Sequence, residues 1–185
     1  ANNSIYSNPA KLANIKNIQV SSGAGNLYGF SWLPSYYFTA HISLPIVGNI
    51  GFGFQQLKTE IGSVTLSKER TFSIAHGFNL QKDKNSQLSM GFVANYMLWD
   101  LGTSSGQSGD GTDGIPLGLL NATTIDFGML ASLRNKYHCG VYIKNINAGA
   151  IGKGITRTIL PQRFNAGITY MPISNLSTSV AIERL

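Results

Sequence analysis

The chain has 185 residues, the size of one domain or of a piece of a larger one. Only 12% of the residues are charged, about half of the roughly 25% typical of soluble domains, whereas 43% are hydrophobic and 21 are glycine. This composition excludes intrinsic disorder, and no apolar run reaches the roughly 18 residues that a membrane-spanning helix needs. The net charge of +6 is not concentrated in any sequence segment, so no nucleic-acid partner is expected.

The N-terminal stretch 1–16 contains the sequence Asn8-Pro9-Ala10. An Asn-Pro pair favours a turn, so these residues by themselves predict a turn that leads into the first strand. Direct contact with a ligand is the alternative for the same three residues.

From residue 17 onward, apolar and polar residues alternate in repeated segments. In one of them, Phe72 and Ile74 share a face, and Thr71, Ser73 and Ala75 lie on the opposite face. Alternation with a period of two is the main signal of a strand, so the chain is predicted to be all-β. The expected strands are 17–23, 36–45, 50–59, 70–80, 88–100, 123–134, 137–146, 163–171 and 176–185.

The polar face of these strands is unusual because it is made mostly of Gly, Ser, Asn and Thr. Its isolated charges are Asp126, Lys144, Arg163 and Glu183, all opposite the apolar positions. A charge on a lipid-facing strand position costs about 2–4 kcal/mol at the middle of a bilayer. The pattern therefore favours an antiparallel transmembrane β-barrel of up-and-down hairpins, with a polar lumen. A soluble β-sandwich that acts as a binding module is the alternative.

The lengths of the connections support the barrel. Short connections are expected around 47–49, 82–86, 135–136 and 173–175, and long ones at 24–35, 60–69, 101–122 and 147–162. Alternating short turns and long loops are typical of outer-membrane barrels. Nine strands are an odd number, so the chain is predicted to be part of a longer barrel; eight strands, with 17–23 outside the wall, are the alternative.

An aromatic-rich stretch follows the first expected strand. It comprises Tyr28, Phe30, Trp32, Tyr36, Tyr37 and Phe38. Aromatic girdles lie at both membrane boundaries of barrels, which is the preferred interpretation. Binding of an apolar ligand or of a protein partner is the alternative.

The remaining candidates for chemistry are weak. Asp110 and Asp113 lie in a glycine-rich loop that hints at Ca²⁺, but no full calcium-binding pattern is present, and a mobile outer loop that contacts a partner is preferred. His41 and Ser43 share one face without an orienting third group. Cys139 is expected to be an inert small hydrophobe. Neither a metal, a cofactor nor an enzymatic activity is predicted.

The segment Tyr6–Ala13 resembles the Asn-Pro-Ala-Gly-Leu-Ala stretch near the N-terminus of FadL-like outer-membrane barrels. The resemblance is closest to their PorV/PorQ branch, which is linked to type IX secretion. Lys11 stands where that family usually has glycine. The passages 142–146 and 159–167 are also similar to passages of the family. The resemblance implies that residues 1–16 form an entry or plug segment in the barrel mouth and that 17–185 form barrel strands.

The resemblance further implies a role in the bacterial outer membrane. The protein is expected to serve protein secretion and surface attachment as a membrane-embedded platform for a secreted client or a translocon component, through the loops 60–69, 101–122 and 147–162. The alternative is a FadL-like channel for small hydrophobic molecules. The expected partners are outer-membrane lipid or lipopolysaccharide and a protein.

Overall fold

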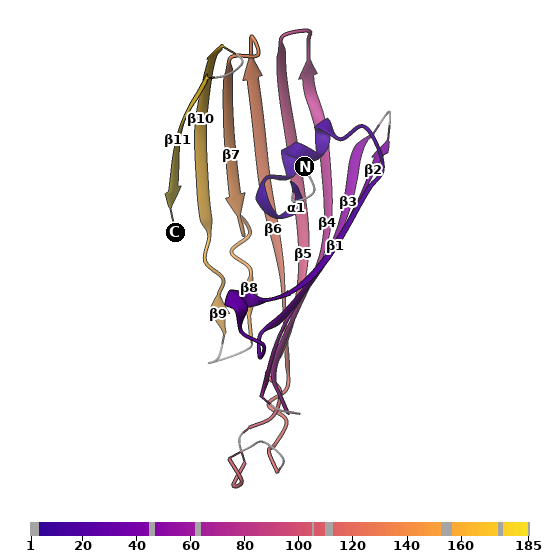
Figure 1. The fold of residues 1–185 in the computed structure, drawn as a ribbon, viewed down its shortest axis with the longest axis vertical. Helices are drawn as coiled ribbons and strands as arrows, with labels where there is room; N and C mark the ends of the chain where they lie inside the picture. The colour runs from indigo at the N-terminus through magenta and orange to yellow at the C-terminus, as the bar shows by residue number, and fades with distance from the viewer. Residues whose placement is uncertain are drawn as a thin grey trace.

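A computed structural model describes residues 4–44, 47–61, 64–104, 106–109, 113–152, 157–173 and 176–184. Strands make up most of it, and no helix among these residues has the length and apolar character to cross a membrane (Figure 1). In chain order the elements are α1 (Ser4–Ser7), η1 (Pro9–Asn14), β1 (Gln19–Asn26), η2 (Leu27–Gly29), β2 (Pro34–Leu44), β3 (Gly48–Ile61), β4 (Val64–Lys82), β5 (Ser86–Asp100), β6 (Leu119–Leu133), β7 (Tyr137–Lys144), β8 (Ala150–Ile151), β9 (Thr158–Ile159), β10 (Arg163–Ile173) and β11 (Leu176–Arg184).

Nine of the strands form one antiparallel sheet in the order β1-β2-β3-β4-β5-β6-β7-β10-β11. Each strand pairs with its neighbours along the chain, and the short β8–β9 hairpin lies between β7 and β10 in sequence. The all-β, antiparallel, up-and-down prediction is confirmed. In the part of the chain that the structure describes, β1 and β11 are the edges of an open, strongly curved sheet. Since β1 pairs with β2 over its whole length, the eight-strand alternative is wrong.

The two faces of the sheet are reversed relative to a soluble protein. Ile74 on the outer face is 60% exposed, whereas its neighbours Ser73 and Ala75 on the inner face are 2% and 1% exposed. The same alternation of buried and exposed residues runs through the middle of β5 and β6. The inner, concave face is therefore the buried one although its side chains are mostly small and polar. The large apolar side chains point outward. A lipid-facing sheet has this arrangement.

Several predicted connections are shorter in the structure. Strand β3 continues to Ile61 and β4 begins at Val64, so the long loop predicted at 60–69 is wrong. The charged residues at 58, 60 and 68–70 all lie in the β3–β4 ladder, which continues as far as the Ile61–Val64 pair. Charged side chains are compatible with a strand once it leaves the bilayer and both its faces meet water.

The other long connections are also partly structured. The 24–35 connection shrinks because β1 extends to Asn26 and β2 begins at Pro34. Strand β6 begins at Leu119, inside the predicted 101–122 loop, and the 147–162 connection contains β8 and β9.

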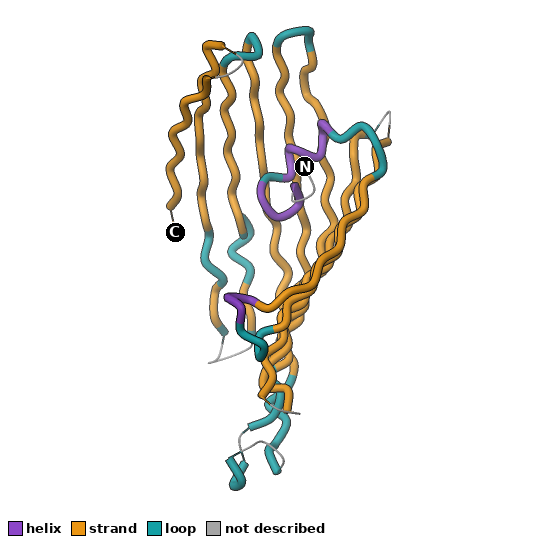
Figure 2. The backbone as a smooth tube through the Cα atoms, viewed as in Figure 1, coloured by secondary structure: helices purple, strands orange, loops and turns teal. Residues whose placement is uncertain are grey.

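The N-terminal segment does not join the sheet. Figure 2 shows α1 and η1 within the concave side, in the upper half of the view, near the short turns that join β4 to β5 and β6 to β7. Residues 4–14 lie there before the chain enters the sheet as β1.

Candidate functional site

The candidate site is the inner face of the sheet together with the N-terminal segment that packs on it, Ser4–Ile15. Ile5, Leu12 and Ile15 form an apolar cluster with Ala75 of β4 and Val93 of β5. Ala75 and Val93 are apolar residues of the inner face and are each 1% exposed. The segment is thus attached by a small hydrophobic core of its own.

Asn8 begins η1 and fastens it to the opposite part of the sheet. Its side-chain oxygen accepts a hydrogen bond from the Ala10 amide at 3.0 Å, which caps the helix, and Pro9 occupies the first helical position. Its amide nitrogen donates to the carbonyl oxygens of Val141 at 3.0 Å and Met129 at 3.4 Å. One buried side chain therefore links the N-terminal helix to β6 and β7.

The carbonyl groups at the C-terminal end of η1 are held by amide side chains of the sheet. Asn49 of β3 donates to the Ile15 oxygen at 2.6 Å and also to the Leu12 oxygen. Asn79 of β4 donates to the Ala13 oxygen at 3.1 Å. These bonds satisfy carbonyl groups that a helix end leaves without internal partners.

Glycines make the room for this segment. Gly77, Gly91 and Gly128 are paired side by side across β4, β5 and β6. A Cβ atom at Gly91 would lie 2.6 Å from the Pro9 oxygen, and one at Gly77 would lie 2.6 Å from the Leu12 Cβ. A Cβ at Gly128 would lie 2.8 Å from the Pro9 Cδ. We call these three glycines the glycine row.

The sequence showed many glycines on the polar face of the strands but not this alignment. All three lie on the polar face of the alternating pattern, so the sequence places them on the same side of the sheet. Which glycines lie opposite one another depends on strand register, and this is not visible in the alternation itself.

A second buried polar group lies farther from the short turns, around Asp126 of β6, which is 2% exposed. Its carboxylate accepts hydrogen bonds from the Asn95 amide at 3.0 Å, the Tyr142 hydroxyl at 3.2 Å and the Asn145 backbone amide at 2.8 Å. The Asn145 side chain in turn donates to the Pro161 oxygen at 2.8 Å. The network therefore ties both ends of the β7–β10 connection to the inner face.

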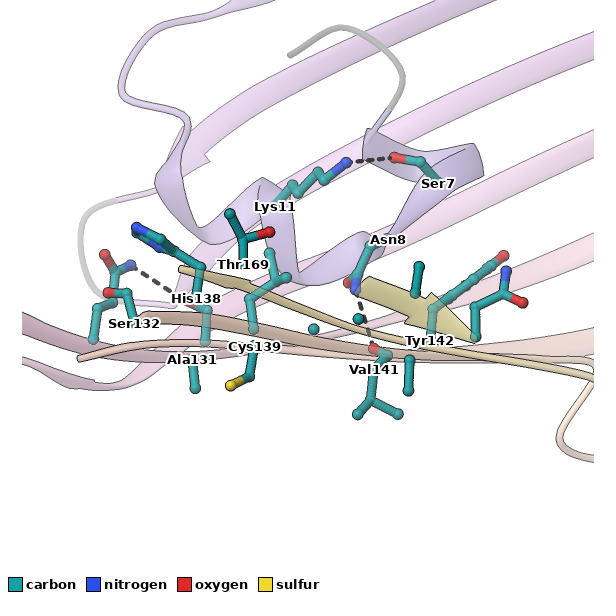
Figure 3. A pocket seen from close by; sticks show the side chains of 18 of the residues that line it. Ser7, Asn8, Lys11, Ala131, Ser132, His138, Cys139, Val141, Tyr142 and Thr169 are labelled. Atoms are coloured by element: carbon teal, nitrogen blue, oxygen red, sulfur yellow. Dashed lines mark hydrogen bonds between the residues drawn. The ribbon is translucent and has the colours of Figure 1, made fainter. Parts of the chain in front are cut away.

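A cavity of about 850 Å³ lies between the N-terminal segment and strands β5, β6, β7, β10 and β11. Figure 3 shows Lys11, His138 and Thr169 on the cavity side of the sheet, with Ser7 and Asn8 along its wall. The Lys11 ammonium donates to the Ser7 hydroxyl at 3.2 Å. Amide and hydroxyl side chains, such as those of Ser7, Gln87 and Thr169, share the lining with apolar residues such as Leu130 and Ile182.

Burial also affects Tyr6, which lies in α1 against Gly53 of β3. A Cβ at Gly53 would lie 2.7 Å from the Tyr6 hydroxyl. Burial raises the pKa of Tyr6 to about 12, because the phenolate would lose its hydration there.

The predicted aromatic residues are not brought together in one site. Tyr28, Phe30 and Trp32 lie in the β1–β2 connection, where the rings of Phe30 and Trp32 stack with centroids 5.1 Å apart. Tyr36 and Tyr37 lie in β2, and Tyr37 covers Gly23 of the neighbouring strand. A different alignment emerges across four strands, where Phe38, Phe54, Phe72 and Tyr96 are paired in one row.

The loop carboxylates are also separated from the inner face. Asp110 lies outside the described residues. Asp113 accepts hydrogen bonds from the Ser108 hydroxyl at 2.5 Å and the Gln107 amide at 3.0 Å, and these bonds, the Ser108 hydroxyl first, hold the pKa of Asp113 below its usual range. No group of three or more His, Cys, Asp or Glu side chains able to hold a metal occurs among the described residues.

The two remaining candidates from the sequence are placed apart. His41 is fully buried on the inner face of β2, opposite Gly51. Cys139 is exposed, and Figure 3 shows its side chain on the side of the sheet away from the cavity.

Comparison with known proteins identifies the family. Residues 1–183 match the family model described as "Type IX secretion system membrane protein PorP/SprF". The curated proteins and the solved structures that were searched contain no match. The match confirms the link to type IX secretion and the outer-membrane location that were expected. The chain therefore belongs to the PorP/SprF family of type IX secretion system membrane proteins and is a protein of the outer membrane.

Proposed function

We propose that this protein is a non-enzymatic platform in the outer membrane, PorV/PorQ-like in role, which holds a secreted client or a translocon component on its long-loop side. The observation that carries the proposal is the length of strands β3 to β6, which continue well beyond the part of the sheet that suits a bilayer.

Strand β4 gives the clearest measure of this extension. It runs from Val64 to Lys82, whereas a tilted strand needs only about 9–11 residues to cross a membrane. The stretch from Thr71 to Gln81 carries no Asp, Glu, Lys or Arg. Arg70, Glu69 and Lys68 follow at one end. The part from Val64 to Arg70 therefore extends roughly 20 Å past the uncharged stretch.

The four strands form a paired projection there. Lys68 pairs with Lys58 of β3 and with Asp100 of β5, which in turn pairs with Leu119 of β6. Figure 1 shows these strand ends converging at the bottom of the view, away from the short turns. We call this region, residues 56–61, 64–70, 98–104 and 113–121 among those described, the outer projection.

The outer projection exposes apolar side chains beyond the part of the strands that contacts lipid. Ile115, Leu117 and Leu119 are 73%, 54% and 56% exposed. They are held in an ordered connection, since Thr103 bridges to Pro116 and the Leu101 amide donates to the Gly118 oxygen at 3.1 Å. Clustered apolar side chains on a fixed support are typical of a surface that binds protein.

The same arrangement bears on two other expected ligands, membrane lipid and small hydrophobic molecules. The outward apolar face of the sheet suits contact with outer-membrane lipid, including the acyl chains of lipopolysaccharide. Passage of small hydrophobic molecules, the FadL-like alternative, is less well supported because the N-terminal segment covers the inner face of β4 to β6.

The test replaces the exposed apolar side chains of the outer projection in the full-length protein, in a bacterium that depends on it for type IX secretion. The double variant Ile115→Asn and Leu117→Asn is expected to lose most surface delivery of type IX clients while it still inserts and migrates heat-modifiably. The matched control is Ile173→Asn, a side chain that is 65% exposed at the short β10–β11 turn, at the opposite end of the strands. Unchanged delivery by the double variant, or equal loss in the control, would overturn the proposal.

A further inference from the structure

Six of the 14 Lys and Arg residues, which are scattered along the sequence, gather at one end of the folded chain. Among the described residues, the short-turn end carries six basic residues against the single acidic residue Asp83; they are Lys11, Lys16, Lys82, Lys84, Arg134 and Lys136. All six are exposed. We call them the basic rim. The outer projection differs, because Lys58, Lys68 and Arg70 are balanced there by Glu60, Glu69, Asp100 and Asp113.

Contacts between the turns show that the basic rim is one surface. The β6–β7 turn is joined to the β4–β5 turn by a hydrogen bond from the Asn135 amide to the Asn85 oxygen at 3.1 Å. Arg134 and Lys136 therefore lie beside the turn that carries Lys82 and Lys84. Lys16 and Lys82 line the same smaller cavity of about 650 Å³.

The basic rim also borders the interior of the curved sheet. Lys11 lies on the N-terminal segment, in the concave side, and lines the 850 Å³ cavity together with Asn135 of the β6–β7 turn. The acidic residue that lines this cavity is Glu183 of β11; it lies farther in, at the register of Asn165, Tyr142 and Gly128. An incoming chain thus meets cations first and a wall of mixed polar and apolar side chains behind them.

The rim cations are not neutralised by the fold. Asp83 accepts a hydrogen bond from the Gln81 amide at 2.7 Å, and the salt bridge found among the described residues joins Lys58 to Glu60 at the opposite end. Six like charges on one rim repel one another and attract an anionic partner.

We propose that the short-turn end of this protein is a docking site for an acidic protein segment, which the basic rim attracts and the mouth of the cavity beside Lys11 receives. A protein segment is favoured over a lipid headgroup because Lys11 and Lys16 lie on the N-terminal segment inside the curve, where the acyl-chain boundary does not reach. This inference concerns the opposite end from the outer projection and stands independently of the platform proposal.

The test uses the full-length protein in nanodiscs of zwitterionic phosphatidylcholine and a short fluorescent peptide of alternating Glu and Gly. Binding is expected to be salt-dependent, and a peptide with Gln in place of Glu is expected not to bind. The quadruple variant Lys82→Gln, Lys84→Gln, Arg134→Gln and Lys136→Gln is expected to weaken binding by at least ~10-fold. Equal binding by this variant would overturn the proposal.

A matched variant separates location from net charge. Lys68→Gln, Lys144→Gln, Arg157→Gln and Arg163→Gln together remove the same number of positive charges from the other half of the molecule, and binding is expected to stay at the level of the unsubstituted protein. If this control weakens peptide binding equally, binding depends on the overall charge of the protein, and the proposed site is overturned. Heat-modifiable migration of every variant shows that each has folded.

The lipid alternative is tested with two further measurements. The pair Lys11→Gln and Lys16→Gln is expected to weaken peptide binding, because these cations lie inside the curve. If this pair has no effect and anionic phosphatidylglycerol discs abolish peptide binding, the rim is a lipid-headgroup surface and the proposal is wrong.

Discussion

At Gly91, the lack of a side chain allows the N-terminal segment to lie on the sheet. A Cβ atom there would come within 2.6 Å of the Pro9 oxygen, a backbone atom that cannot rotate away. Overpacking of this kind costs about 1–3 kcal/mol. The contact between Pro9 and Gly91 lies on the inner face, whereas the outer face meets lipid. The free-energy penalty of an added Cβ therefore weakens attachment of the N-terminal segment rather than pairing of the strands.

The variant Gly91→Ala is therefore expected to loosen the N-terminal segment. The measurement is the rate at which a thiol reagent modifies the side chain introduced by Ser4→Cys, a near-isosteric change at a site that is 1% exposed, in a Cys139→Ser background. An increase on the order of tenfold is expected from the ~1–3 kcal/mol penalty.

Gly167→Ala in β10 is the matched control, because the nearest atom to a Cβ there is the Val180 oxygen at 3.5 Å, an ordinary contact. Its labelling rate is expected to equal that of the parent protein. The idea of a glycine row fails if Gly91→Ala and Gly167→Ala behave alike.

Tyr6 provides a pH-dependent prediction at the same scale. Burial raises the pKa of Tyr6 to about 12, against an ordinary value of about 10. Below pH 10 the phenol is neutral whether the segment is seated or lifted, so its seating does not vary with pH. Between about pH 10 and 12 the lifted form ionises first, and attachment of the segment therefore weakens as the pH rises.

The tyrosinate absorbance of the parent protein minus that of Tyr6→Phe is expected to titrate near pH 12. In the Gly91→Ala background, the same difference is expected to move back toward the ordinary value. A difference titration near pH 10 in the parent protein would contradict the burial of Tyr6.

At the scale of elements, the buried side chain of Asp126 holds the start of the β7–β10 connection. Asp126 accepts bonds from Asn95, Tyr142 and Asn145, and Asn145 adopts a positive φ of 56° where the chain leaves β7. Asp126→Ala would leave these three donors without their acceptor. Since hydrogen bonds to charged groups contribute about 1.5–3 kcal/mol each, a loss of about 3 kcal/mol or more is expected.

The expected result for Asp126→Ala is a lower temperature of heat modification and faster proteolysis between residues 145 and 161. Asp113→Ala removes a carboxylate from an exposed loop and is expected to leave both measurements unchanged. Asp126→Asn, which keeps the size and one acceptor oxygen, is expected to fall between them. Unchanged behaviour of Asp126→Ala would show that the network does not hold the connection.

For the whole molecule, the short turns and the outer projection mark opposite sides of the membrane. Barrels of the outer membrane have short turns on the periplasmic side and longer loops outside. Lys84 in the β4–β5 turn and Gln107 in the loop after β5 are both exposed and lie at opposite ends of the strands. A membrane-impermeant thiol reagent added to intact cells is expected to label Gln107→Cys and to label Lys84→Cys only after permeabilisation, both in the Cys139→Ser background.

Labelling of Lys84→Cys in intact cells, with protection of Gln107→Cys, would reverse this orientation. The outer projection would then face the periplasm and the basic rim the exterior, so the client and the acidic partner would exchange sides.

The sequence by itself determined the class of fold, the nine strands and the faces of the sheet. These follow from alternation with a period of two and from the lack of charge on the polar face, both of which are local properties. The link to type IX secretion also followed from a local motif around Asn8. The loop predicted at 60–69 was wrong, because β3 and β4 continue as a paired ladder beyond the alternating stretch.

Only the tertiary structure decided what meets across the strands. The register placed Gly77, Gly91 and Gly128 side by side under the N-terminal segment, and it brought Asp126 to Tyr142 and Asn145. The curvature then gathered cations that are far apart in the chain onto one rim. Such contacts join residues that are distant in sequence, so they depend on strand pairing and closure rather than on any pattern within a single segment.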